Sequence, residues 1–194
     1  GRVKKRSNPT ETNGAASPGT PYIWPATGDD AGTGGSGPQP VTWTSAVGLT
    51  VNGNSLTKTA ASGWGNAGAS SVQSILSGDG YVEVTANETN TYRMIGLSNG
   101  DTNQNFPELD HAINLTSNGT MIVYENGAPK GSSVSYANGD LLRVAIEGGV
   151  VKYKKNGNVF YTSTVAPAYP LLVYTALHTT GATLNSVMIS GAAG

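Results

Sequence analysis

From residue 41 onward, apolar and polar side chains alternate in short runs, and this period of two predicts β-strands rather than helices. In segment 141–147, Leu142, Val144 and Ile146 fall on one side, while Arg143 and Glu147 fall on the other. We therefore expect the three apolar side chains to face a core and the two charged ones to face solvent.

Similar runs recur every 8 to 12 residues, and no window shows a helical stripe of apolar positions. The runs predict strands at 41–45, 56–59, 70–76, 81–85, 91–98, 109–115, 121–125, 141–147, 150–154, 159–163, 171–177 and 182–189. Asn-Gly pairs begin at 52, 99, 118, 126, 138 and 156, and this pair is typical of type I′ hairpin turns. The predicted class is all-β.

Two of these runs, 91–97 and 171–177, carry apolar residues on both faces. Such strands are expected at the centre of a sheet, with the outer face covered by a loop or by a partner. Two antiparallel sheets packed face to face account for the alternating and the two-sided strands together.

Residues 1–40 have a different character, since they show no apolar periodicity and 28–40 has the composition of a linker. The only apolar cluster there is Tyr22, Ile23 and Trp24. We therefore predict an extended N-terminal arm at 1–40 and a β-sandwich domain at 41–194. The chain begins at Gly1 rather than Met, which we interpret as a sign of processing.

Charge and cysteine content narrow the classes of function. Only 12% of the residues are charged, the net charge is −1 and there is no cysteine. Thiolate chemistry and cysteine zinc sites are excluded, and no overall field attracts nucleic acid. Four basic residues near the N-terminus would give nucleic acid only a weak, salt-sensitive contact.

No apolar run approaches the ~18 residues of a membrane span. A surface rich in amides and hydroxyls is typical of secreted β-proteins and of fibre or coat subunits, so we expect an extracellular or cell-surface location.

A succession of motifs carries a family resemblance. In chain order these are Trp-Gly-Asn-Ala-Gly-Ala-Ser-Ser at 64–71, Gly-Asp-Gly-Tyr-Val-Glu at 78–83, Ile-Gly-Leu-Ser at 95–98, Met-Ile-Val-Tyr-Glu-Asn-Gly at 121–127, Tyr-Ala-Asn-Gly-Asp at 136–140 and Val-Lys-Tyr-Lys-Lys-Asn-Gly at 151–157. The succession resembles the SPRY-like branch of the concanavalin A-like lectin/glucanase superfamily, as in modules of large secreted bacterial surface proteins. The resemblance implies a two-sheet antiparallel jelly roll. It leaves function open, because this superfamily includes lectins, protein-binding modules, glycosidases and structural domains.

The glycosidases of that superfamily carry Glu-x-Asp-x-x-Glu on one strand, which places nucleophile and acid/base on one face. Here Glu108 and Asp110, separated by Leu109, match the first two acids, but Ile113 occupies the place of the last glutamate. No group would then protonate the leaving oxygen. We therefore predict no catalytic residue and no enzymatic activity.

The loop before this motif is the candidate metal site. Oxygen-bearing side chains at alternate positions suit a hard cation such as Ca²⁺. The candidate ligands are Asp101, Asn103, Asn105 and Glu108. The loop departs from an EF-hand, because Phe106 stands where glycine is needed and Ala112 where the closing glutamate belongs. No other cofactor is indicated.

Glycan binding calls for aromatic rings beside amides, because sugars offer an apolar face and directional hydroxyls. The candidate residues are the aromatic Trp64, Tyr92, Phe106 and Tyr174 with the polar Asn66, Arg93 and Asn103. Trp64 is equally compatible with a core position.

Three functions remain as hypotheses. The first is a non-catalytic structural or adhesive subunit of an extracellular assembly (filament, fibre or coat), a homo-oligomer in which the arm with Tyr22, Ile23 and Trp24 pairs with a neighbouring subunit. The alternative is a lectin-like carbohydrate-binding module of a secreted protein. The third, a glycosidase, is the least favoured because of the missing glutamate.

Overall fold

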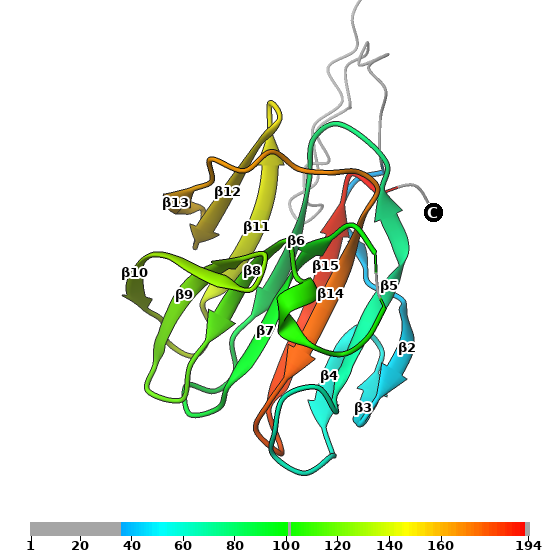
Figure 1. Ribbon diagram of the computed structural model, residues 1–194, viewed down its shortest axis with the longest axis vertical. Coiled ribbons are helices and arrows are strands. Elements are labelled where there is room, and N and C mark those ends of the chain that lie inside the picture. The colour runs from blue at the N-terminus through cyan, green and yellow to red at the C-terminus, as the bar shows by residue number, and fades with distance from the viewer. Residues whose placement is uncertain (1–35, 101, 193–194) are drawn as a thin grey trace, which may run out of the picture. The chain divides into compact units, whose positions relative to one another are not determined.

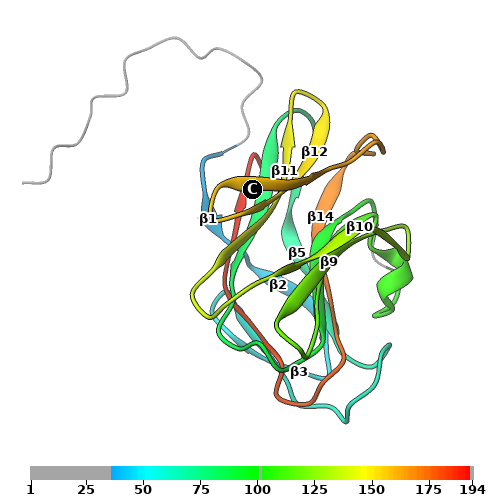
Figure 2. The same cartoon turned by 90° about the vertical axis from the view of Figure 1, so that its left-hand side faces the viewer.

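The computed structural model describes residues 36–100 and 102–192. These residues form two antiparallel sheets that pack face to face (Figures 1 and 2). The predicted arm residues Tyr22, Ile23 and Trp24 lie outside the described residues. The predicted fold, an all-β jelly-roll sandwich of two antiparallel sheets, is confirmed.

Sheet A contains eight strands. In spatial order they are β13 (Asn158–Thr162), β12 (Val150–Lys155), β11 (Leu141–Glu147), β6 (Gly80–Thr85), β15 (Thr183–Ser190), β4 (Ser55–Lys58) and β3 (Leu49–Asn52), with β1 (Gln39–Pro40) also paired to β15. β1 belongs to the segment that we expected to be arm. The sandwich therefore includes residues before 41: Gln39 pairs with Ile189, and the Ser36 amide donates to the Ala192 carbonyl.

Sheet B contains seven strands. In spatial order they are β10 (Ala128–Ser135), β9 (Thr120–Glu125), β8 (His111–Leu115), β7 (Arg93–Ser98), β14 (Leu171–Leu177), β5 (Gly68–Ile75) and β2 (Trp43–Val47). A single 3₁₀ turn, η1 (Phe106–Glu108), lies in the loop between β7 and β8 within the described residues. The strand that we expected at 109–115 therefore begins two residues later, at His111.

The core lies between the sheets, and the predicted faces of β11 are confirmed. Leu142, Val144 and Ile146 are buried, whereas Arg143 and Glu147 are half-buried on the outer face. The predicted hairpin turns are also found at two Asn-Gly pairs. Asn126 and Asn156 both have a φ of 49°, and each is followed by a glycine with positive φ, as a type I′ turn requires.

The prediction of two central, two-sided strands is confirmed as well. β7 and β14 are neighbours in the middle of sheet B, and every residue of β7 is buried. Their outer face carries a second apolar cluster, formed by Met94, Leu109, Ala112, Tyr174 and Ala176. In Figure 1 the loop with η1 crosses in front of β7 and β14, so a loop of the same chain covers this face.

A cluster of buried polar side chains lies between the two sheets. Tyr153 on β12 donates its hydroxyl to Glu125 Oε1 on β9 at 3.0 Å, and His111 Nδ1 on β8 lies 3.5 Å from the same oxygen. Burial, followed by the neighbouring Glu125 carboxylate, raises the pKa of Tyr153 well above its usual range. The phenol therefore stays protonated, and its hydrogen bond joins sheet A to sheet B.

Candidate functional site

A pocket of about 340 Å³ opens on the outer face of sheet B. Four aromatic rings, a methionine, an amide and an imidazole line it: Trp64, Tyr92, Met94, Phe106, Asn114, Tyr124 and His178. Within the described residues this lining contains no carboxylate, lysine or arginine. The pocket thus combines apolar ring faces with the polar side chains of Asn114 and His178.

The floor of the pocket comes from the strands. Asn114 on β8 pairs with Met94 on β7, and Tyr124 on β9 pairs with Ala112. Because side chains alternate along a strand, Asn114 lies on the opposite face from Ile113, which belongs to the core. The register of three adjacent strands therefore brings these side chains to one face.

The walls are held by ties between strand ends. The His178 amide, just after β14, donates to the Tyr92 carbonyl at 3.0 Å, and the Tyr92 amide donates to Thr179 Oγ1 at 2.9 Å. The rings of Tyr92 and His178 are 5.8 Å apart at 74°, and those of Trp64 and His178 are 5.1 Å apart at 58°. Three rings from three segments thus form one continuous wall.

The loop with η1 provides the remaining wall. The Phe106 ring meets Trp64 edge-on at 5.3 Å and Tyr124 at 6.1 Å. Gly65, with a φ of +85°, allows the two loops to approach closely, because a Cβ there would lie 2.4 Å from Asn105 Oδ1. The positive φ, more than this contact with the end of the Asn105 side chain, favours glycine in the Trp-Gly-Asn motif at the edge of the pocket.

Glu108 fixes the shape of this loop. Its carboxylate accepts hydrogen bonds from the Thr102 amide at 2.9 Å and the Asn103 amide at 3.2 Å, and also from both of their side chains. Burial by itself raises the pKa of Glu108, but the hydrogen bonds from Thr102 and Asn103 together outweigh it and hold the pKa below its ordinary value. The ionised carboxylate is therefore the form that organises the loop.

This arrangement bears directly on the predicted calcium site. The oxygens of Glu108 accept from the loop itself, and Asn103 Oδ1 accepts from the Asn105 amide at 2.8 Å. Asp101 lies outside the described residues. In the described part of the chain, no three acidic or histidine side chains converge as a metal site would require. Within the described residues, Asn103 and Glu108 thus accept hydrogen bonds from the loop, and the calcium site stays a prediction.

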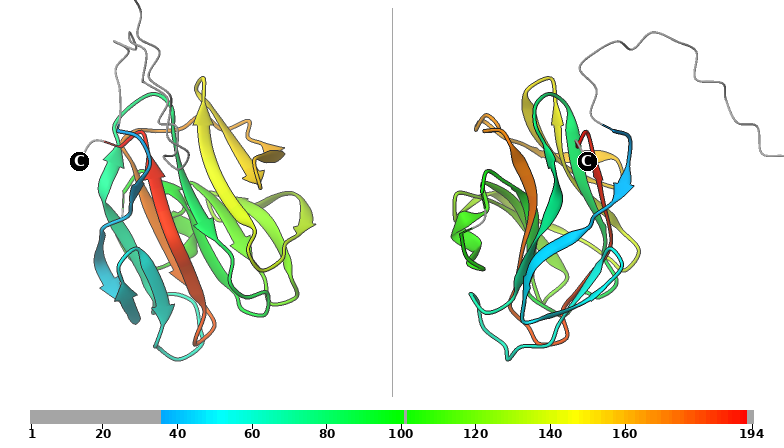
Figure 3. Two further views of the ribbon diagram at one scale, coloured as in Figure 1. Left: turned by 180° about the vertical axis from the view of Figure 1, so that it is seen from behind. Right: turned by 90° about the vertical axis from the view of Figure 1, so that its right-hand side faces the viewer.

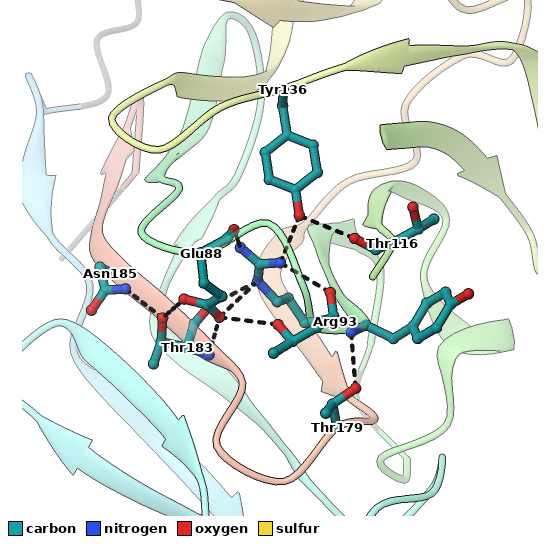
Figure 4. A network of polar contacts seen from close by, with 9 residues as sticks. Glu88, Arg93, Thr116, Tyr136, Thr179, Thr183 and Asn185 are labelled. Carbon is teal, nitrogen blue, oxygen red and sulfur yellow. Dashed lines mark hydrogen bonds and ion pairs between the residues drawn. The ribbon is translucent and has the colours of Figure 1, made fainter. Parts of the chain in front are cut away.

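Arg93, a predicted ligand-binding residue, points away from the pocket. It faces the sandwich interior and is 1% exposed. Its guanidinium donates to the carbonyls of Glu88, Thr91 and Thr183 at 2.8–3.1 Å and forms an ion pair with Glu88 at 3.4 Å (Figure 4). The structure therefore gives Arg93 an internal bracing position, since its polar atoms are directed at the chain itself.

The other predicted glycan residues are distributed unevenly. Trp64, Tyr92 and Phe106 are brought together in the pocket. Asn66 instead contacts Lys58 and the Ala61 carbonyl, Asn103 contacts Glu108, and Tyr174 is buried in the apolar cluster beneath the pocket.

The incomplete glycosidase motif is not carried by one strand. Glu108 lies in η1, whereas Asp110 precedes β8 and accepts from the Asn99 amide at 2.8 Å. Ile113 faces the core. The two acids are therefore engaged in loop contacts.

Sequence reasoning missed four lining residues: Met94, Asn114, Tyr124 and His178. Asn114 carried a signal, because it is an amide at an alternate position of a run whose neighbours are apolar on both sides. Its Oδ1 and the Nδ1 of His178 are buried and have no hydrogen-bond partner within the described residues. A buried amide oxygen is costly in a folded protein unless water or a ligand supplies a donor. Because Asn114 lines an open pocket, a bound molecule can reach it there.

No protein-family model matches this sequence, and no curated protein matches it. Similar solved structures exist at low identity. The carbohydrate recognition domain of Emp47p matches with a TM-score of 0.51 and 12% identity, over 84% of this chain and 99% of that one. The exoplasmic/lumenal domain of VIP36, in its Ca²⁺/Man3GlcNAc-bound form, matches with a TM-score of 0.56 and 8% identity, over 77% of this chain and 83% of that one. The SPRY domain of human HERC1 matches with a TM-score of 0.50 and 17% identity, over 79% of this chain and 97% of that one.

These likenesses establish the fold. The described sandwich is a concanavalin A-like jelly roll of the type shared by lectin-like and SPRY domains, as the motifs at 64–71 and 151–157 predicted. Among residues 36–100 and 102–192, there is no helix with the length and apolar character needed to cross a membrane.

Proposed function

We propose that this chain is a carbohydrate-binding module that holds a sugar in the pocket on sheet B. The observation that carries the proposal is the Asn114 amide. Asn114 is only 9% exposed, its Oδ1 has no partner within the described residues, and it lies among the rings of Tyr92, Phe106 and Tyr124. A sugar hydroxyl would supply the missing donor while the ring's C–H face packs on the aromatic walls.

The residues around the pocket favour binding over cleavage. The lining described here contains no carboxylate, and Glu108 of the covering loop accepts hydrogen bonds from Thr102 and Asn103. Two carboxyl groups on either side of the scissile bond are the usual requirement for glycoside hydrolysis. The pocket therefore suits a ligand that is bound and released unchanged.

The comparisons support the same class. Two of the similar structures are carbohydrate recognition domains, of Emp47p and Emp46p, and that of VIP36 is a glycan-bound form. Carbohydrate binding therefore replaces assembly as our main proposal, and we retain the extracellular or cell-surface location. The assembly hypothesis depends on Tyr22, Ile23 and Trp24, which lie outside the described residues.

A glycan array followed by titration calorimetry tests the proposal. We expect binding of at least one glycan, and we expect Tyr92→Leu to weaken it by about tenfold, because the substitution removes an exposed ring from the rim. Tyr81→Leu is the matched control, since Tyr81 stacks under Arg143 on sheet A, with the guanidinium 3.6 Å from its ring centre. The proposal fails if no glycan binds, or if the Tyr81 variant weakens binding as much as the Tyr92 variant.

A further inference from the structure

Lys58, the last residue of β4, is a buried cation surrounded by oxygens. Its Nζ lies 2.7 Å from both the Gly63 carbonyl and Asn66 Oδ1, 2.8 Å from the His178 carbonyl and 2.9 Å from the Leu177 carbonyl. The side chain is 1% exposed, and none of the ion pairs found in the described residues involves it.

Four acceptors exceed the three N–H groups of an ammonium, so at least one hydrogen is shared and the charge itself attracts the oxygens. This resembles the coordination of a monovalent cation by carbonyls, which replace its hydration shell. Burial lowers the pKa of Lys58. The four oxygen dipoles oppose that effect, because they stabilise the charged form.

The four oxygens come from two segments that carry pocket residues. Gly63 and Asn66 lie on either side of Trp64 in the chain. Leu177 ends β14, and His178 follows it with its ring against Trp64. The Gly63 amide also donates to the His178 carbonyl at 2.9 Å. The ammonium therefore lies where the wall segment and the strand end meet.

We propose that Lys58 is a positioning residue that acts as a built-in cation: it fixes Trp64 and His178 in the geometry that receives the ligand, so that binding requires no divalent metal ion. The inference rests on the proposed function for the identity of its ligand. That Lys58 joins the two segments follows from its own contacts and does not depend on any ligand. An uncharged side chain of similar volume would avoid the desolvation penalty of a buried charge. The presence of a charged side chain here is therefore explained by its contacts with the four oxygens.

Cation rescue of Lys58→Ala tests this role. The substitution leaves a space ringed by the four oxygens, which ammonium or potassium can enter and tetramethylammonium cannot. We expect the affinity for the glycan identified on the array to fall at least about tenfold, and to recover in ammonium chloride but not in tetramethylammonium chloride at equal ionic strength. Chelation with EDTA should leave the affinity of the wild-type protein unchanged.

A second measurement uses no glycan. Amide hydrogen exchange in segments 59–67 and 177–180 should be faster in Lys58→Ala and should slow again with ammonium. Lys155→Ala is the control, since Lys155 donates only to the Ser135 carbonyl at an exposed site. If the wild-type protein binds no glycan, the proposed function fails while this exchange readout still tests Lys58.

Three outcomes would overturn the inference. The first is Lys58→Met, which fills the volume without charge, binding the glycan as tightly as the wild-type protein. The second is a loss in Lys58→Ala that tetramethylammonium repairs as well as ammonium does. The third is loss of wild-type binding in EDTA. A Lys58→Ala protein that folds only in the presence of ammonium would support it.

Discussion

Arg93 on β7 donates to the hydroxyl of Tyr136 at 2.9 Å, and that hydroxyl donates in turn to the Thr116 carbonyl at 3.2 Å. The same guanidinium reaches the Glu88 carbonyl and the Thr183 carbonyl on β15. One buried side chain thus joins sheet B to sheet A (Figure 4). Figure 3 shows the two sheets from two further sides. The next residue of β7, Met94, lines the pocket.

Arg93→Met should destabilise the fold strongly. The substitution leaves Glu88 without its cation and several buried carbonyls without donors, so we expect the free energy of unfolding to fall by about 3 kcal/mol or more in urea. Arg143→Met is the matched control. Arg143 pairs with Glu83 on the outer face of sheet A, where both side chains keep 20–31% exposure, so the loss should be about 1 kcal/mol. Equal losses in the two variants would contradict the bracing role of Arg93.

Asn114→Leu should have opposite effects on stability and on binding. Leucine has nearly the shape of asparagine, and it removes an amide oxygen that has no partner in the described structure. We expect the free energy of unfolding to rise by about 1 kcal/mol, while glycan affinity falls at least about tenfold.

The control for this prediction is Asn54→Leu. The Asn54 amide donates to the Val187 carbonyl at 2.9 Å, so its replacement should lower stability by about 1 kcal/mol. A stability loss in Asn114→Leu as large as that in Asn54→Leu would show that the Asn114 amide is already satisfied, and would remove the main support for a ligand there.

Much of the fold could be predicted because its inner strands alternate cleanly, as β11 and β12 do. Three strands were missed. β1 is a two-residue strand in the segment that was expected to be arm, and β3 and β10 lie at sheet edges, where most of their residues are exposed on both faces. Without a buried face there is no apolar alternation to detect. β10 also contains Pro129 and Gly131, which are typical of turns.

The candidate site was less predictable, because it depends on register between strands. Trp64, Tyr92 and Phe106 were identified from their chemistry alone. Asn114 could be placed in the pocket, and Arg93 in the interior, only once the faces of β8 and β7 were known. His178 is placed in the site by a hydrogen bond to Tyr92, which is far from it in sequence, and no local sequence pattern predicts such a contact.

Acid should open the pocket through Glu108. Its pKa is held below the ordinary value of 4.5, so its stabilisation of the loop is fully present above pH 4.5 and is lost as the pH falls through the lower, folded value. This contribution to glycan affinity should therefore be lost as the pH falls below about 4.5, as Phe106 loses its support.

Glu108→Gln should bind weakly at neutral pH and should lack this acid step, which titration calorimetry across pH would show. Asp140, hydrogen-bonded by Asn156, and Glu147, hydrogen-bonded by Lys154, also have lowered pKa values. They titrate in the same acid range but lie outside the pocket, so their variants Asp140→Asn and Glu147→Gln serve as controls. An acid step that persists in Glu108→Gln would assign it to another group.

Two N-terminal truncations separate the sandwich from the arm. Removing residues 1–40 deletes β1 and with it the Ser36 contacts, in which the Ser36 amide and Oγ donate to the Ala192 carbonyl and the Gly191 amide donates to the Ser36 carbonyl. That protein should be less stable than one lacking only 1–35, by about 1–3 kcal/mol, in thermal and urea unfolding.

Light scattering on the shorter deletion then tests assembly: the hypothesis of an arm with Tyr22, Ile23 and Trp24 requires the full chain to form oligomers that the protein lacking 1–35 does not form. Identical oligomeric states in the two proteins would refute that hypothesis and leave the pocket as the part of the chain with a proposed function.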